Sequence, residues 1–303
     1  MTDGSSDVRC TGGRAKKRQR VVCDPSLSAY EYIRAIGKGS FGSVALYRTE
    51  SGRMYAMKSV HSRDFQILKD TFQSTLNFES EGQLLEQCSH DNIVHLHCRF
   101  LENERWYLVQ SYIAGPTLLK ILMEEMLSET RALKHALSLI SALAYLHTKS
   151  MMHRDVNLSN IIIETLQHEN HRLVLVDFGL ARLLHTNEKC HTYCGTTGYI
   201  APEVYLQSSP EVECREGYGV AADAWSLGVV LYAMICGQTP FGQDSETVHA
   251  TYYDPPPFDE DTWLHTSSST ESLATELLQK AVQQRLLVER AREHRTFANL
   301  DPI

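Results

Sequence analysis

The sequence has no apolar stretch long enough to cross a membrane. Its longest apolar run, Leu227 to Cys236, is far shorter than the roughly 20 residues of a transmembrane helix. The first residues, Met1 to Cys10, are polar and lack the apolar centre of a secretory signal. We therefore expect no membrane partner and a location in the cytoplasm, the nucleus or both.

Cysteine pairs at the spacing of redox or zinc motifs are also absent. The eight cysteines stand at positions 10, 23, 88, 98, 190, 194, 214 and 236, and no two form a C-x-x-C pair. This scatter is typical of reduced thiols inside a cell and predicts no disulfide framework. Cys190, His191 and Cys194 come nearest to a metal cluster, but a fourth ligand at zinc spacing is missing. We favour solvent-facing loop residues there over a zinc site.

An excess of positive charge is missing as well. The 303 residues carry 29 Lys and Arg against 37 Asp and Glu, a formal net charge of -8, so the composition indicates no nucleic-acid partner. One basic run, residues 14–20, lies in a polar tail that we place at residues 1–27. It is open to two interpretations, a nuclear-localisation signal or a solvated flexible tail, and we favour the tail.

What the sequence does contain is a strand-rich part followed by a helix-rich part. Period-two alternation predicts strands, and apolar residues at helical spacing predict helices. In the first part we expect strands at Tyr32–Ile36, Val44–Tyr47, Met54–Met57, Ile93–Phe100 and Trp106–Gln110 and a helix at Glu79–Cys88. In the second part we expect helices at Ala132–His147, Ala224–Ile235 and Ser272–Arg292. The parts join near Ser111–Pro116, so the predicted fold class is α+β.

A glycine-rich motif stands at the first predicted turn. Residues 37–44, GKGSFGSV, match the pattern G-x-G-x-x-G-x-V. Glycines let a strand-turn-strand backbone approach phosphates closely and aim its amides at them. A dinucleotide-binding fold uses a similar motif, but there the glycines open a helix, whereas the strand-like Val44 to Tyr47 follows here. The motif therefore favours a hairpin that covers phosphates.

Lys58 closes an apolar strand soon after the glycines. By itself such a lysine is most often an ordinary strand-edge residue. A fixed cation at this place would pair with nucleotide phosphates if a carboxylate on the following helix holds it. Glu81 is our candidate for that carboxylate, and Glu79 is the alternative.

Acidic and amide side chains follow the long predicted helix. In the segment HRDVNLSN, Asp155 supplies a carboxylate that accepts a proton from a hydroxyl, and Asn160 supplies an amide oxygen for Mg²⁺. Asp177, in an Asp-Phe-Gly tripeptide after the apolar strand Leu173 to Val176, adds a carboxylate for a hard cation. In this order and at these spacings the elements predict a single phosphate-transfer site.

Together with Ala201-Pro202-Glu203, these motifs resemble the signature of the eukaryotic protein kinase family, Ser/Thr type, from Tyr30 to Thr296. The resemblance implies a two-lobed protein-kinase-like fold over residues 28–303. A small N-lobe of β-sheet with one key helix is expected at 28–111, and a larger, mostly helical C-lobe at 112–303. It also implies transfer of the γ-phosphate of ATP, with Mg²⁺, to Ser or Thr hydroxyls of a protein substrate.

The resemblance assigns roles residue by residue. Asp155 is expected as the catalytic base, Lys58 and Asn160 as further catalytic residues, and Asn160 and Asp177 as metal ligands. The residues expected to bind ATP are Ile36, Gly37, Lys38, Gly39, Ser40, Phe41, Gly42, Val44, Ala56, Lys58, Glu81, Tyr112 and Ile162. Two hydrophobic stacks through the lobes are expected, Leu85, Leu96, Phe178 and His153 in one and Val44, Ala56 and Ile162 in the other.

The segment between Asp177 and Glu203 resembles an activation loop. Thr192 matches the regulatory phosphosite of related kinases, whose phosphate would neutralise Arg154. An upstream activating kinase that acts at Thr192 is therefore an expected partner. Thr196 matches the threonine that the family places against the catalytic aspartate.

The resemblance also implies two supporting contacts in the C-lobe. Asp223 should brace the catalytic loop. Glu203 should pair with an arginine near the C-terminus, for which we favour Arg295 over Arg290 and Arg292.

Two positions depart from the family. Asn157 stands where Ser/Thr kinases usually carry a lysine, and it supplies no charge toward the transferring phosphate. Gln110 falls behind the adenine pocket and is unusually polar for that place. The missing lysine keeps open the alternative of a pseudokinase or scaffold that binds nucleotide or partners with little turnover. A small-molecule kinase is a third interpretation, weakened because those enzymes lack the Ala-Pro-Glu element.

Overall fold

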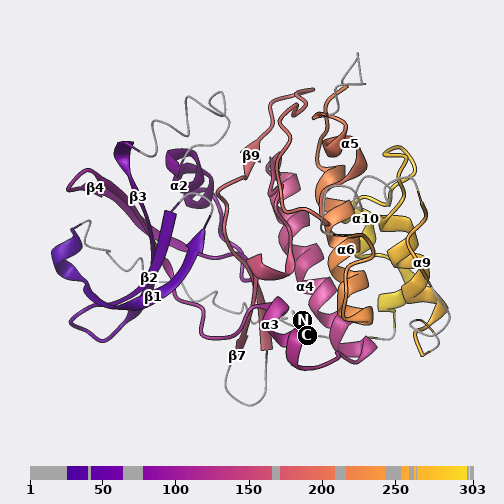
Figure 1. Cartoon of the computed structure of the whole chain (residues 1–303), viewed down its shortest axis with the longest axis horizontal. Helices are drawn as coiled ribbons and strands as arrows, with labels where there is room; N and C mark the ends of the chain where they lie inside the picture. The colour runs from indigo at the N-terminus through magenta and orange to yellow at the C-terminus, as the bar shows by residue number, and fades with distance from the viewer. Residues whose placement is uncertain are drawn as a thin grey trace, which may run out of the picture.

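The computed structural model describes residues 26–39, 42–63, 78–165, 171–208, 216–242, 254–258, 263, 265–298 and 300. These residues form two lobes (Figure 1), a smaller one of strands with helix α2 and a larger one built mainly of helices. The predicted two-lobed α+β fold is confirmed. The basic run at 14–20 lies outside the described residues, as do Ser40 and Phe41.

The N-lobe contains a five-stranded antiparallel sheet in the order β1-β2-β3-β5-β4. Its strands are β1 (Glu31–Gly39), β2 (Gly42–Arg48), β3 (Met54–His61), β4 (Leu96–Glu102) and β5 (Arg105–Ser111), with helix α2 (Phe78–Glu86) between β3 and β4 and the short 3-10 helix η1 (Leu27–Ala29) before β1. The strand predicted from Ile93 starts only at Leu96, because Ile93 forms a single bridge to Leu175 of the other lobe.

The two faces of this sheet have different surroundings. Side chains alternate along a strand, and Tyr55 and Met57 lie on the outer face, where Tyr30 completes a small buried cluster. Lys58 and its cross-strand partner Leu108 lie on the opposite, inner face. Lys58, the predicted phosphate-binding cation of β3, therefore lies on the face of the sheet that is turned toward α2 and the C-lobe.

The C-lobe is organised around two long helices, α4 and α6. Its helices are α3 (Leu118–Glu124), α4 (Glu129–Thr148), α5 (Pro202–Tyr205), α6 (Ala221–Cys236), α9 (Ser268–Leu277) and α10 (Val288–Ala291), with 3-10 helices η2 (Leu158–Asn160) and η4 (Arg295–Phe297). Two small antiparallel sheets pair β6 (Met151–Met152) with β9 (Arg182–Leu183) and β7 (Ile161–Thr165) with β8 (His171–Leu175). Ser128 begins α4 by accepting a hydrogen bond from the backbone N–H of Arg131.

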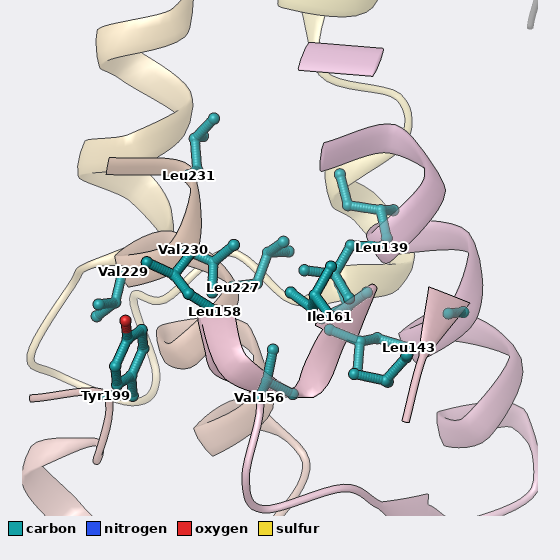
Figure 2. Packing of buried hydrophobic residues seen from close by; sticks show 14 of the residues in the cluster. Leu139, Leu143, Val156, Leu158, Ile161, Tyr199, Leu227, Val229, Val230 and Leu231 are labelled. Atoms are coloured by element: carbon teal, nitrogen blue, oxygen red, sulfur yellow. The ribbon is translucent and has the colours of Figure 1, made fainter. Parts of the chain in front are cut away.

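The core of the C-lobe holds the segment that follows α4. Figure 2 shows Val156, Leu158 and Ile161 between the apolar side chains of α4 and α6. Each of the three is at most 5% exposed, and full burial of one such side chain is worth about 1.5–3 kcal/mol. Polar residues that alternate with them, such as Asp155 and Asn160, are therefore held at fixed places. No helix among the described residues, the apolar α6 included, could cross a membrane.

The predicted helix Ser272–Arg292 is wrong in its extent. Helix α9 ends at Leu277 and α10 starts only at Val288. Between them the Arg285 guanidinium turns inward and donates to the carbonyl oxygens of Gln279 (2.8 Å) and Lys280 (3.3 Å). These bonds satisfy backbone groups that a continuous helix would have paired internally, so a tertiary contact overrides the helical periodicity.

Candidate active site

The glycine-rich motif forms the β1–β2 hairpin rather than the start of a helix. Gly39 pairs with Gly42 across the hairpin, and Gly37 pairs with Val44. Gly42 has to be a glycine, because a Cβ atom there would lie 2.4 Å from the carbonyl oxygen of Ser59 on β3. Val44 is the cross-strand partner of Lys58, so this hairpin ends beside the buried ammonium.

Lys58 is only 3% exposed, and its ammonium contacts two carboxylates. Nζ donates to Oε2 and Oε1 of Glu81 at 2.8 and 3.0 Å, and to Oδ1 of Asp177 at 2.6 Å. Glu81 belongs to α2, whereas Asp177 follows β8 in the C-lobe, so the contacts join three separate parts of the fold. The side chain of Glu79, the alternative partner, lies outside the described residues.

The Lys58 ammonium and each of the two carboxylates favour one another's charged forms. Burial alone would lower the pKa of Lys58, but the charges of Glu81 and Asp177 outweigh it and raise that pKa above its ordinary value. Burial raises the pKa of Glu81, so this carboxylate depends on Lys58 to stay charged. Burial also opposes ionisation of Asp177, yet the Lys58 ammonium prevails and lowers the pKa of Asp177. One ammonium against two carboxylates leaves a net negative charge, which suits a cation at Asp177.

The other residues predicted to bind ATP differ in burial and in place on the sheet. Ile36 is half-buried although most of β1 is exposed. Ala56 stands two residues before Lys58 on β3, and the alternation of a strand therefore places the two side chains on the same face. Gly37 and Lys38 of the hairpin are exposed.

The connection between the lobes is fixed to the C-lobe. It starts with Tyr112, directly after β5. The backbone N–H of Ile163 donates to the carbonyl oxygen of Pro116 at 3.0 Å, and Thr117 forms a bridge with Ile162 on β7. Ile162 is thus brought from the C-lobe to the connection that carries Tyr112.

Asp155 accepts two side-chain hydrogen bonds in the segment after α4. Thr196 Oγ1 donates to its Oδ1 at 2.6 Å, and Asn160 Nδ2 donates to its Oδ2 at 2.8 Å. Asn160 Nδ2 also donates to the Asp155 carbonyl oxygen at 3.0 Å. Because the amide nitrogen of Asn160 is engaged in this way, its oxygen Oδ1 is the atom that remains for a cation.

Asn157, the departure from the family, is buried and structurally engaged. It is 3% exposed, and its Oδ1 caps η2 by accepting from the backbone N–H groups of Ser159 and Asn160. Its Nδ2 donates to Thr196 Oγ1 at 3.0 Å, so it orients the same hydroxyl that contacts Asp155. The position therefore supplies a neutral positioning contact in place of a cation.

Backbone geometry around the catalytic segment is unusual and tightly braced. Arg154 (φ 64°) and Asp177 (φ 58°) adopt left-handed conformations that non-glycine residues rarely take. Asp223, 1% exposed, accepts hydrogen bonds from the backbone N–H groups of His153 and Arg154, both at 2.9 Å. His153 in turn stacks edge-on against Phe178 at 4.8 Å. Such strain persists only where the surroundings over-determine it.

Asp223 also contacts a histidine that sequence reasoning missed. His147 Nε2 lies 3.1 Å from Asp223 Oδ2, and His147 Nδ1 lies 2.9 Å from Glu289 Oε1 on α10. Burial alone would lower the pKa of His147, but its hydrogen bonds to the two carboxylates raise it to about 9. A basic residue in the last turn of α4 was the only available sequence signal, and it does not reveal the partners.

The Arg154 guanidinium is buried beside the loop that carries Thr192. Its Nε donates to the carbonyl oxygen of Leu180 at 2.6 Å and its Nη1 to the Tyr218 hydroxyl at 3.5 Å. Its Nη2 has no hydrogen-bond partner among the described residues. Tyr218 donates its hydroxyl to the Thr192 carbonyl oxygen at 2.7 Å, so Tyr218 links Thr192 to an incompletely paired cation.

The prediction that Cys190 faces solvent is wrong. Cys190 is fully buried, and its backbone exchanges two 2.8 Å hydrogen bonds with Tyr218, just before α6. Because of this pairing, the segment around Cys190 packs beside the start of α6 and the Cys190 thiol is buried. Within the described part of the chain, no three His, Cys, Asp or Glu side chains are grouped as a metal site requires.

The prediction that Glu203 pairs with Arg295 is also wrong. Arg285 Nη1 and Nη2 bind Oε1 and Oε2 of Glu203 at 2.5 and 2.9 Å, and the guanidinium lies over the Trp225 ring at 5.1 Å. Arg295, like Arg290 and Arg292, is exposed. Spacing along the chain could not identify Arg285, because the turn between α9 and α10 is what brings it inward.

The converging side chains fit a magnesium-dependent phosphoryl-transfer site. Asp177 and Asn160 offer oxygen ligands, which Mg²⁺ prefers, and Lys58 offers a fixed cation for phosphates. Asp155 stands beside them as an acceptor for a hydroxyl proton. A two-lobed fold with this set of side chains is typical of nucleotide-dependent phosphotransferases.

Comparison with known proteins identifies the family. Residues 30–297 match the protein kinase domain family, and the chain belongs to it. The chain is 33% identical over 77% of its length to Serine/threonine-protein kinase cds1 of Schizosaccharomyces pombe, covering 50% of that protein. It is 31% identical over 99% of its length to human RAC-beta serine/threonine-protein kinase, covering 60% of it. It is 35% identical over 72% of its length to mouse Protein kinase C eta type, covering 30% of it.

The chain therefore spans between about a third and about three fifths of the length of these relatives. Each of them is named as a kinase, and none of these matches favours the alternative of a pseudokinase. The family uses ATP, typically with Mg²⁺, and the predicted Ser/Thr type agrees with the relatives found.

Proposed function

We propose that this chain transfers the γ-phosphoryl group of ATP to Ser or Thr hydroxyls of a protein substrate. The observation that carries the proposal is the convergence of Lys58, Glu81 and Asp177 across the two lobes. A purely binding domain has no need to bury Lys58 and Glu81 at a lobe junction, because burying charges costs free energy.

In the proposed reaction, the acceptor oxygen forms a bond to the γ-phosphorus while the bond to the bridging oxygen of ADP breaks. Lys58 holds the phosphates and Asp155 takes the hydroxyl proton. Asp177 and Oδ1 of Asn160 would hold Mg²⁺, which supplies positive charge to the phosphate oxygens. Thr196 and Asn160 keep the Asp155 carboxylate in one orientation through their hydrogen bonds.

Radiolabelled ATP with generic protein substrates tests this function. Wild-type protein is expected to label serine and threonine, and Asp155→Asn to lose label by at least about 100-fold, since general base catalysis contributes about 10²–10⁴-fold. Asn keeps the shape of the side chain, so calorimetry should still detect binding of Mg-ATP. Equal labelling by both proteins, or no heat with wild type, would refute the proposal.

Thr192 is proposed as a regulatory phosphosite for an upstream kinase. The incompletely paired Arg154 and its link through Tyr218 support this assignment. Phosphorylation should order the loop and raise activity. Unchanged activity and unchanged protease sensitivity of the loop in Thr192→Ala would contradict it.

A cytoplasmic or nuclear location is proposed from the scattered cysteines and the basic run at 14–20. A fluorescent fusion of the full chain, compared with one in which the basic residues of that run are replaced by glutamine, measures the nuclear fraction. Secretion of the fusion would contradict the proposal.

A further inference from the structure

Helix α2 carries a glycine directly after Glu81. Gly82 is buried in the middle of this helix, although a glycine inside a helix is destabilising relative to alanine. The helix packs against β4 of the N-lobe sheet and also contacts β9 of the C-lobe (Figure 1). A residue that weakens α2 beside its contact with the catalytic lysine therefore calls for a structural reason.

The reason is the short distance between α2 and the sheet. A Cβ atom on Gly82 would lie 2.7 Å from Cδ of Arg99 on β4 and 3.0 Å from Cδ2 of Leu108 on β5. Carbon atoms in good contact are about 3.5–4.0 Å apart, so a side chain here would crowd both neighbours. Leu108 is 1% exposed. Arg99 is tied to the same helix, because its Nε donates to Glu86 Oε1 at 2.8 Å.

The register of the sheet connects this crowding to the catalytic lysine. Leu108 is the cross-strand partner of Arg99 on one side and of Lys58 on the other, so the three side chains stand in one row on the inner face. Gly82 lies against two members of this row. Its neighbour Glu81 binds the ammonium of the third. An outward shift of α2 that makes room for a Cβ atom would therefore move the Glu81 carboxylate away from Lys58.

We infer that Gly82 is a positioning residue of the phosphoryl-transfer site. Because it has no side chain, α2 lies at the distance from the sheet at which Glu81 holds Lys58. Gly82 does not touch the reacting atoms and acts through these two side chains. The inference rests on the proposed function, since it assigns Gly82 a role in that same reaction.

Gly82→Ala measures this role. Calorimetry counts the sites that bind Mg-ATP, and radiolabelled ATP gives KM and kcat per binding site. Relief of the crowding needs a shift of up to about 1 Å, and a misplacement of that size can cost about 100-fold in rate. We expect kcat per binding site to fall about tenfold to 100-fold. KM for ATP should change less than kcat, because the disturbed contact acts mainly in the transition state.

Two further backgrounds test the route of the effect. Arg99→Ala removes the nearest crowded atom, so the cost of adding Gly82→Ala should be at least about threefold smaller there than in wild type. In Glu81→Gln the positioned carboxylate is already gone, and adding Gly82→Ala should lower kcat little further. If Gly82→Ala alone fails to fold, recovery of folding in the double variant with Arg99→Ala supports the close approach. Equal losses of folding or of kcat in both backgrounds would refute it.

Gly228 offers a matched control. It lies in α6, where a Cβ atom would come within 2.9 Å of Cβ of Leu277 and 3.0 Å of the Leu278 side chain. This crowding is similar in degree but lies within the C-lobe core. Gly228→Ala should lower the melting temperature and leave kcat per binding site unchanged. A fall in kcat per site as large as that of Gly82→Ala would contradict a specific role for Gly82.

The outcomes separate this inference from the proposed function. If wild type transfers phosphate and Gly82→Ala keeps the wild-type kcat per binding site, the role of Gly82 is refuted while the kinase proposal stands. If wild type transfers no phosphate, the proposed function fails, and the role of Gly82 fails with it.

Discussion

Two sets of buried charges in this protein follow the same physics and have different uses. The cleft set, Lys58 with Glu81 and Asp177, joins the lobes. The bracing set lies within the C-lobe and consists of His147 between Asp223 and Glu289 and of Arg285 with Glu203. In the cleft set, the Asp177 side chain keeps 31% of its surface exposed. In the bracing set, Asp223 is 1% exposed, and its oxygens are taken by backbone N–H groups and His147.

The difference in exposure separates charges that can bind a ligand from charges that stabilise the fold. Asp177 has an open side and an excess of negative charge around it, so it can take up a cation during turnover. Asp223 is buried and its oxygens already accept hydrogen bonds, so its role is to fix the backbone of His153 and Arg154. We expect changes in the cleft set to remove activity per folded molecule, and changes in the bracing set to lower stability first.

The largest effect is expected for Lys58→Met. Removing the ammonium takes away the fixed cation that pairs with the phosphates, and activity per folded molecule should fall at least about 100-fold, as for loss of one transition-state contact. The folded fraction is measured by circular dichroism, and transfer by radiolabelled ATP. Undiminished activity in this variant would remove Lys58 from the site.

Arg285→Ala should act mainly on stability. The substitution removes the bidentate partner of the Glu203 carboxylate. Breaking such a buried pair costs about 3–5 kcal/mol of unfolding free energy. Arg295→Ala is the control, since Arg295 is exposed and surface changes stay within about 0.5 kcal/mol. Urea unfolding measures both. Equal losses would show that Glu203 does not depend on Arg285.

The smallest effect is a pH dependence from His147. Its pKa is raised to about 9 from an ordinary value of about 6.5, so the charged form stabilises the fold. That contribution is complete below about pH 6.5 and is lost as the pH rises to about 9, on the order of 3 kcal/mol at most. Asp223 and Glu289, the carboxylates that face His147, have lowered pKa values. They therefore change the stability only at acidic pH.

Unfolding free energy measured from pH 6 to 10 checks this slope. His147→Gln keeps a hydrogen-bonding side chain without the charge, so it should flatten the slope over that interval. A slope that persists unchanged in His147→Gln would assign the pH dependence to another group.

Much of the candidate site could be predicted from sequence, because its residues sit in short motifs. Asp155 and Asn160 are five positions apart in one segment, and the motif itself implies their proximity. Glu81, the candidate preferred to Glu79, is the residue that contacts Lys58. The lobes followed from a change in hydrophobic period from two to 3.6.

Contacts between distant segments were beyond the reach of the sequence. Arg285 and Glu203 are 82 positions apart, and the sequence favoured Arg295, which is exposed. The burial of Cys190 follows from its pairing with Tyr218, which is distant from it along the chain. Local patterns carry no information about such partners.

The sequence by itself determined which chemical groups this protein has and the order in which strands and helices present them. Only the tertiary structure decided which charges are buried together and that Asn157 caps a turn and orients Thr196. The physical reason is that periodicity and motifs depend on neighbours along the chain, whereas burial and electrostatic pairing depend on neighbours in space.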